Sequence, residues 1–89
     1  MPERRIHIQN KLGLHARASA KLVATAGQFS SEVMLAKESV EVNAKSIMGI
    51  MMLAASKGTL VTISADGEAA EECVASIIQL IDDKFGEGE

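Results

Sequence analysis

The last quarter of the sequence carries the pattern that most constrains the fold. Between its charged positions, apolar residues recur every three or four places: Ala70, Val74, Ile77, Ile78, Ile81 and Phe85. This spacing predicts an amphipathic helix that must cover an apolar surface elsewhere in the chain. Glu68, Glu71 and Glu72 fall near its expected N-terminal end, where the helix dipole favours negative charge. Residues 86–89 are expected to fray.

Four short segments have the composition of β-strands and can supply that surface. Residues 4–8 alternate apolar and polar side chains, and residues 59–65 are rich in β-branched types. Two further runs, 33–35 and 40–42, flank residues 37–39, which predicts a hairpin. Because each strand has one apolar face, the sheet needs helices on one side only.

Two more helices are predicted between the strands. The first spans the alanine-rich segment 16–26, with Gly27 as its stop. In the second, Ser46 is a natural N-cap for the apolar run 47–53, and residues 57–58 are expected to close it. The resulting order, βαββαβα, predicts a two-layer α/β (α+β) sandwich of four strands and three helices.

Size and composition restrict where function can lie. A chain of 89 residues is expected to form one domain, 1–89, that is too small for a deep active site, so function should lie on the surface. No apolar run resembles a signal peptide or a membrane span, so we expect a cytoplasmic protein without membrane insertion. Cys73 is the only cysteine, which excludes an internal disulfide, and its place on the apolar stripe predicts a core residue. Neither a metal nor a cofactor is predicted.

Charge is distributed unevenly along the chain. Residues 1–65 contain eight Lys and Arg against four Asp and Glu, whereas residues 66–89 contain one against eight. The basic part suits an anionic group or an acidic partner. Nucleic acid is not expected, because there is no dense basic run and only two aromatic residues could stack on bases.

The residues around His15 are the strongest candidates for chemistry. His15 immediately precedes the first predicted helix, and Arg17 follows within one turn. The unpaired N–H groups of that turn, including those of Ala16 and Ala18, form an anion site whose dipole also disfavours a charged imidazole. Arg17 adds a planar cation suited to phosphate oxygens. Yet a lone histidine at the start of a helix is more often a polar surface residue than a nucleophile, so the spacing alone does not assign a function.

Two segments together carry a family resemblance. Residues 13–20 read GLHARASA, and residues 45–51 read KSIMGIM. At this spacing they closely resemble the histidine-containing phosphocarrier (HPr) family of the bacterial phosphotransferase system, over nearly the whole chain. The resemblance implies an open-faced β-sandwich with a four-stranded antiparallel sheet and three helices on one face.

The resemblance also implies a mechanism. His15 is expected to take a phosphoryl group, on its pros nitrogen Nδ1, from the phosphoenolpyruvate-dependent Enzyme I and to donate it to the IIA component of a sugar permease. Arg17 matches the arginine that positions the group. The chain is then a carrier and not an enzyme. Most relatives have proline at position 18, and Ala18 should keep the helix while altering the transfer rate or affinity.

Further expectations concern the second helix. By resemblance, Ser46 matches the serine that the ATP-dependent HPr kinase/phosphorylase modifies in some bacteria, and a phosphate there would add about −1.5 to −2 charges to the partner surface. The apolar run after it exceeds what one face of a short helix can bury, so part of it should be exposed for partners. The expected partner-binding residues are Ile47, Met48, Met51, Ala20 and Lys21. We expect a monomer.

Two alternatives stay open. In the paralogous nitrogen-related branch, the same His15 chemistry serves regulation and moves no sugar. In a pure interaction module, the exposed methionines would bind a regulator and His15 would be dispensable.

Overall fold

The structure is a computed structural model that describes residues 2–88. Its elements follow the predicted order and end in a short 3₁₀ turn. They are β1 (Glu3–His7), α1 (Ala16–Ala26), β2 (Glu32–Lys37), β3 (Val40–Asn43), α2 (Ile47–Met52), β4 (Leu60–Asp66), α3 (Ala70–Asp82) and η1 (Lys84–Gly86).

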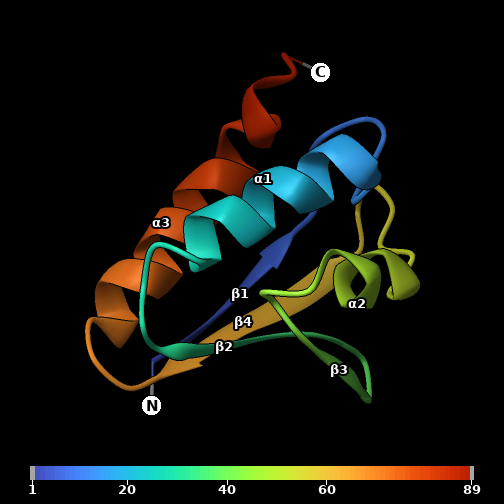
Figure 1. Ribbon diagram of the computed structural model, residues 1–89. Helices are drawn as coiled ribbons and strands as arrows, with labels where there is room; N and C mark the ends of the chain where they lie inside the picture. The colour runs from blue at the N-terminus through green and yellow to red at the C-terminus, as the bar shows by residue number, and fades with distance from the viewer. Residues whose placement is uncertain (1, 89) are drawn as a thin grey trace.

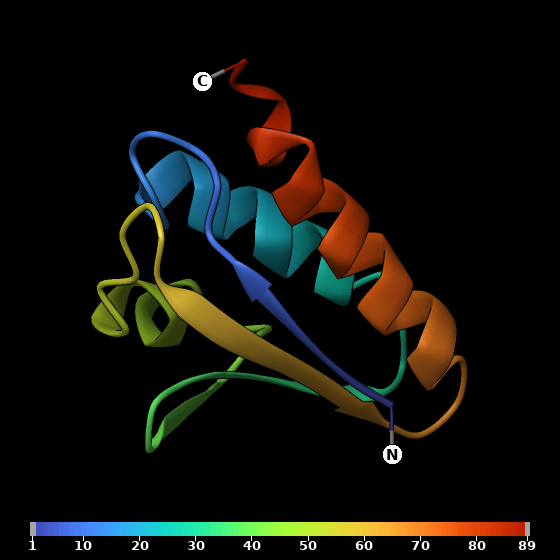
Figure 2. The same ribbon diagram turned by 180° about the vertical axis from the view of Figure 1, so that it is seen from behind.

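The four strands form one antiparallel sheet in the order β1-β4-β2-β3. β4 lies inside the sheet, where Ile63 pairs with Leu35 of β2 and Val61 pairs with Ile6 of β1. All three helices cover the same face, with α1 and α3 side by side and α2 beneath the first turns of α1 (Figure 1). The view from behind shows α3 lying along β1 and β4 (Figure 2). The predicted two-layer, open-faced sandwich is confirmed.

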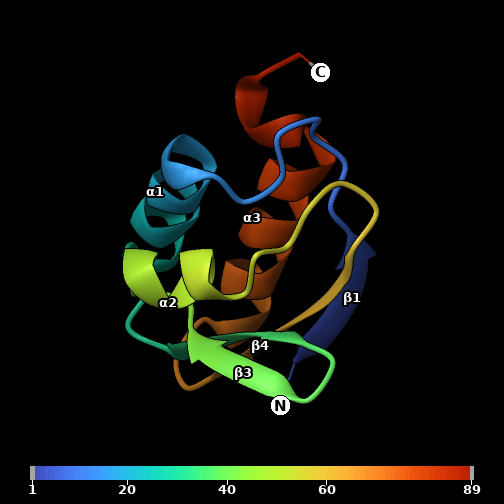
Figure 3. The same ribbon diagram turned by 90° about the vertical axis from the view of Figure 1, so that its right-hand side faces the viewer.

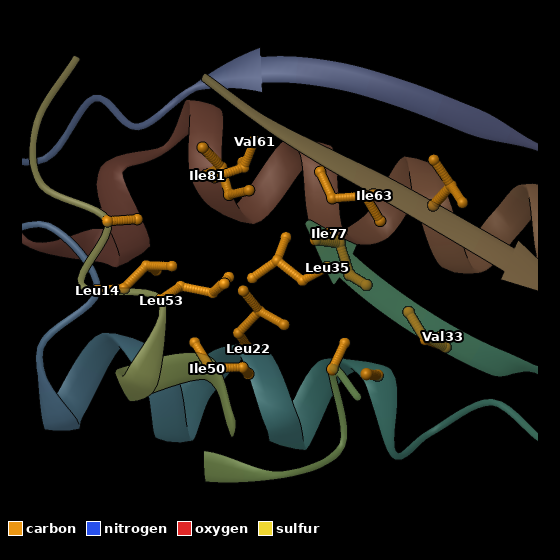
Figure 4. Packing of buried hydrophobic residues seen from close by; sticks show 14 of the residues in the cluster. Leu14, Leu22, Val33, Leu35, Ile50, Leu53, Val61, Ile63, Ile77 and Ile81 are labelled. Atoms are coloured by element: carbon orange, nitrogen blue, oxygen red, sulfur yellow. The ribbon is translucent and has the colours of Figure 1, made fainter. Parts of the chain in front are cut away.

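Alternation along the strands explains why only one face is covered. Along β2 and β4, every second side chain is fully buried and its neighbours are partly or fully exposed. The buried set meets Leu22 of α1, Ile50 of α2 and Ile77 and Ile81 of α3 in one core (Figure 4). Burying each of these large aliphatic side chains contributes about 1.5–3 kcal/mol. Cys73 belongs to the same core, as predicted.

Two helix ends differ from the prediction. α2 stops at Met52 instead of continuing to residues 57–58, because Ala54 takes a left-handed conformation (φ 50°). α3 stops at Asp82, since Lys84 and Phe85 are also left-handed (φ 54° and 55°). Phe85 therefore leaves the helix on which its spacing placed it, although it is fully buried.

The expectation that residues 86–89 fray is wrong for Gly86 and Glu87. Gly86 donates its backbone N–H to Asp83, and the Glu87 side chain bonds to the loop before α1. Residue 89 lies outside the described residues. Among the helices that the structure describes, none is long and apolar enough to cross a membrane.

Candidate functional site

His15 stands at the N-cap of α1, as the sequence predicted. Its backbone is extended (φ −75°, ψ −179°), and its side chain makes no capping hydrogen bond. The first bond of the helix runs from the Ser19 N–H to the His15 carbonyl, at 2.9 Å. The N–H groups of Ala16, Arg17 and Ala18 precede that bond, and together with the helix dipole they carry about half a positive charge. An anion beside His15 therefore meets a preformed site.

The loop before His15 is fixed by packing and by close backbone contacts. Leu14 is buried in the core, and its N–H donates to the Ala55 carbonyl at 2.9 Å. Gly13 adopts φ +66°, and a Cβ at this position would lie 2.5 Å from the Ala55 oxygen. The buried Ser19 hydroxyl donates back to the Leu14 carbonyl at 3.1 Å. The position of His15 thus depends on a glycine that touches the backbone of the loop before β4.

His15 and Arg17 line the same open hollow, which measures about 700 Å³. Its complete lining is Lys11, Leu12, His15, Ala16, Arg17, Lys21, Gly86 and Glu87. The Ala18 methyl group instead points into the core and is 0% exposed, so only its N–H can serve the site. The predicted pair of imidazole and guanidinium is therefore brought together on one surface.

One functional candidate, Glu87, was not predicted from the sequence. Its Oε2 lies 2.6 Å from Nε2 of His15, and its Oε1 accepts a hydrogen bond from Asn10 Nδ2 at 3.1 Å. Desolvation works to raise the pKa of Glu87, but the hydrogen bonds from Asn10 and His15 and the charges of His15 and Lys21 hold that pKa below its ordinary value. Two features of the sequence could have indicated that this segment reaches His15. They are the acidic residues at the C-terminal end and the apolar Phe85, two residues before Glu87.

Phe85 and Lys21 hold this tail in place. The ring of Phe85 is fully buried, and Lys21 Nζ donates to the Phe85 carbonyl at 2.5 Å. The left-handed backbone of Lys84 and Phe85 costs about 1–2 kcal/mol per residue. Burial of the aromatic ring offsets this cost with a contribution of about 1.5–3 kcal/mol. The tail is therefore part of the folded site.

The predicted partner-binding residues lie on two neighbouring helices. Ile47, Met48 and Met51 on α2 are exposed, and so is Met52, which was not among the predicted contact residues. Their exposed fractions are 41%, 76%, 43% and 78%. Ala20 and Lys21 are exposed on α1, which packs beside α2 (Figure 3). We name Ile47, Met48, Met51 and Met52 the α2 patch.

Ser46 caps α2 as predicted. Its Oγ accepts a hydrogen bond from the Gly49 N–H at 3.1 Å, and its backbone is extended. His7, the other histidine, is exposed on β1, in agreement with the predicted alternation of apolar and polar side chains over residues 4–8.

Comparison with known proteins decides the family. The family model described as "PTS HPr component phosphorylation site" matches residues 2–83. The chain belongs to the HPr phosphocarrier family. The phosphocarrier protein HPr of Neisseria meningitidis serogroup A is 53% identical over 89 residues, which is 100% of both chains. The phosphocarrier protein NPr of Shewanella violacea is 38% identical over 96% of this chain and 93% of that protein.

Solved structures of the HPr family agree with the fold. The crystal structure of HPr from Thermoanaerobacter tengcongensis superposes with a TM-score of 0.95, at 50% identity and 98% coverage of both chains. A dimer of the T. tengcongensis protein is also similar, with a TM-score of 0.79, 50% identity and coverage of 98% and 100%.

Proposed function

We propose that the chain carries a phosphoryl group on His15 between Enzyme I and the IIA component of a sugar permease. The observation that carries this proposal is the position of His15 at the N-cap of α1, beside Arg17, in a chain of the HPr family. The chain acts as a carrier and leaves catalysis to its partners. It works in the cytoplasm as a monomer, because both partners need the same face, and it should sediment as one species of 9.4 kDa.

The geometry supports phosphoryl transfer in three ways. The extended N-cap leaves the imidazole free of the helix backbone. A phosphate on the ring lies beside the first N–H groups of α1, and the Arg17 guanidinium can bind its oxygens in a bidentate manner. The hollow is open, so a partner can approach the same phosphorus atom for both loading and unloading. A carrier must bind its phosphoryl group only moderately, because tight binding would stop onward donation.

Sequence identity favours the sugar-linked branch over the nitrogen-related one. HPr proteins from Neisseria are 53% identical to this chain, and the NPr of S. violacea is 38% identical. We therefore expect faster loading from the Enzyme I of the sugar system than from its nitrogen-related paralogue. Equal or reversed rates at matched enzyme concentrations would favour the regulatory branch.

The direct experiment is phosphorylation by Enzyme I and phosphoenolpyruvate. We expect one acid-labile phosphate per chain, and none on the His15→Ala variant, because the acceptor nitrogen is missing. His7→Ala is the matched control, since it removes the chain's other histidine from an exposed strand. Phosphate on His15→Ala, or its absence from the wild-type chain, would contradict the proposal. The latter result would favour a pure interaction module.

We further propose that the α2 patch contacts both partners and that phosphorylation of Ser46 by an HPr kinase/phosphorylase regulates this contact. Ser46 immediately precedes the patch, so negative charge on its oxygen lies beside the surface that an acidic partner must approach. Aspartate is also a good N-cap, so Ser46→Asp should keep α2 folded.

Loading of Ser46→Asp by Enzyme I is expected to be about tenfold less efficient, chiefly through a higher KM, because like charges weaken the encounter. Initial rates at a series of carrier concentrations measure this effect. Ser76→Asp, at a partly exposed position on α3, adds the same charge outside the patch and should load normally. An undiminished efficiency of Ser46→Asp would argue against both the charge effect and the proposed contact surface.

A further inference from the structure

Both oxygens of the Glu87 carboxylate have donors in the site. Oε2 lies 2.6 Å from His15 Nε2, and Oε1 accepts from Asn10 Nδ2 at 3.1 Å. The same Asn10 amide nitrogen donates to the Gly13 carbonyl at 2.8 Å. Because both neighbours of that nitrogen are acceptors, the orientation of the Asn10 amide is determined. Glu87 is thus held against the imidazole by the same loop that positions His15.

The contact is sheltered from solvent. The exposed fraction is 14% for the Glu87 side chain and 28% for the His15 side chain. Buried Phe85 anchors the tail two residues earlier, and Lys21 binds the Phe85 carbonyl. Partial desolvation strengthens a hydrogen bond between a ring N–H and a carboxylate.

We propose that Glu87 is a positioning residue for His15: its carboxylate keeps the proton on Nε2 and leaves the lone pair of Nδ1 to accept the phosphoryl group. This role rests on the proposed function. The arrangement follows the logic of a carboxylate that holds a catalytic histidine in one tautomer and stabilises its charged form. Glu87 lies 72 residues from His15 in sequence, and only the fold brings the two together.

The transfer step explains why charge at Glu87 matters. The Nδ1 lone pair forms a bond to the phosphorus of a phosphorylated donor protein, while the bond from phosphorus to the donor breaks and its electron pair stays with the donor. The Nε2 proton remains in place, so the ring gains positive charge as the new bond forms. The carboxylate at Nε2 stabilises this charge, and returning the phosphoryl group to an acceptor reverses the step.

The carboxylate does not need to leave for the phosphate to bind. Nδ1 and Nε2 lie on different edges of the imidazole ring, so a group on each can be accommodated. Lys11, Arg17 and Lys21 line the same hollow and provide positive charge around the two anionic groups. The Glu87 carboxylate and the phosphoryl group therefore occupy separate positions in one cationic surface.

The test compares Glu87→Gln with the wild-type chain by two measurements. Glutamine keeps the shape of the side chain, but its amide can either accept from or donate to Nε2 and carries no charge. Above about pH 8, where an ordinary imidazole is neutral, ¹⁵N NMR of the His15 ring should show one tautomer with the proton on Nε2 in the wild type and a mixture in Glu87→Gln.

In the second measurement, kcat for phosphorylation by Enzyme I should fall about five- to tenfold in Glu87→Gln, with KM for the carrier unchanged. Glu87→Asp should recover part of the loss, because it restores the charge at a greater distance. Glu72→Gln, which removes a carboxylate from the exposed surface of α3, is the matched control and should match the wild type in both measurements.

The possible results separate this role from the proposed function. Glu87→Gln with an unchanged ring spectrum and an unchanged kcat would overturn the positioning role alone. Faster loading of Glu87→Gln would also overturn it, since the tail would then obstruct the site. A rise in KM without a change in kcat would show that the tail contacts Enzyme I instead. A wild-type chain that takes no phosphate would overturn the proposed function and this role with it.

Discussion

Replacing Arg17 by alanine is expected to slow phosphorylation of His15 by about 10²- to 10³-fold. Arg17 and His15 line the same hollow, and the proposed transfer brings a negatively charged phosphoryl group to this surface. Once a partner covers the hollow, water can no longer replace this donor, which is why its loss should exceed that of an ordinary surface cation. Single-turnover loading by saturating phosphorylated Enzyme I measures the rate of the step itself.

Two further variants make the Arg17 measurement specific. Arg17→Lys keeps the charge but loses the planar pair of donors, so its rate should fall between those of the wild type and Arg17→Ala. Arg5→Ala removes an exposed arginine from β1 and should leave the rate unchanged. If Arg17→Ala loaded as quickly as Arg5→Ala, the phosphate-positioning role of Arg17 would have to be abandoned.

Gly13→Ala is expected to lower the free energy of unfolding by about 3 kcal/mol and Tm by roughly 15 °C. The new Cβ would lie 2.5 Å from the Ala55 oxygen and 2.8 Å from Ser56 Cα, and backbone at φ +66° already disfavours a side chain. The loop must move away from Ala55, which weakens the Leu14 hydrogen bond and displaces His15. Thermal and urea unfolding measure the loss of stability, and loading by Enzyme I should fall in the fraction that remains folded.

Gly58→Ala separates the two causes of this effect. Gly58 also has a positive φ, +90°, but a Cβ there would meet no atom within 4 Å. Its substitution should therefore cost only the conformational strain, about 1–2 kcal/mol, and leave loading of His15 normal. Equal losses in the free energy of unfolding would show that the close approach of Gly13 to Ala55 does not contribute to the destabilisation.

Local patterns were sufficient to predict most of the fold. The alanine-rich segment predicted α1 with its observed bounds, and alternating or β-branched runs located all four strands to within about a residue or two. These signals depend on how often the side-chain direction repeats along a helix or a strand. That repeat can be read from residues close together in the sequence. His15 and Arg17 were also predicted, but through the family resemblance of residues 13–20, because their spacing alone did not assign a function.

Features that depend on tertiary contacts were not predictable from local pattern. Phe85 continued the spacing of α3, yet its backbone turns left-handed so that the ring enters the core and the chain turns back towards His15. Glycine and glutamate at residues 86–87 suggested a frayed end, because the side-chain partners of Glu87, Asn10 and His15, lie more than 70 residues away in sequence. Similarly, the end of α2 at Met52, followed by the left-handed Ala54, was not indicated by the apolar sequence of this segment.

The central claim is that the group on His15 is carried and then handed on. The most direct test is to load the chain with radiolabelled phosphate from phosphoenolpyruvate, remove Enzyme I, and add a purified IIA component. We expect the label to leave the carrier and appear on the IIA protein in equal amount, and the carrier to be ready for a second loading. Label that stays on the chain, or that is released as inorganic phosphate while the IIA protein remains unlabelled, would contradict the account.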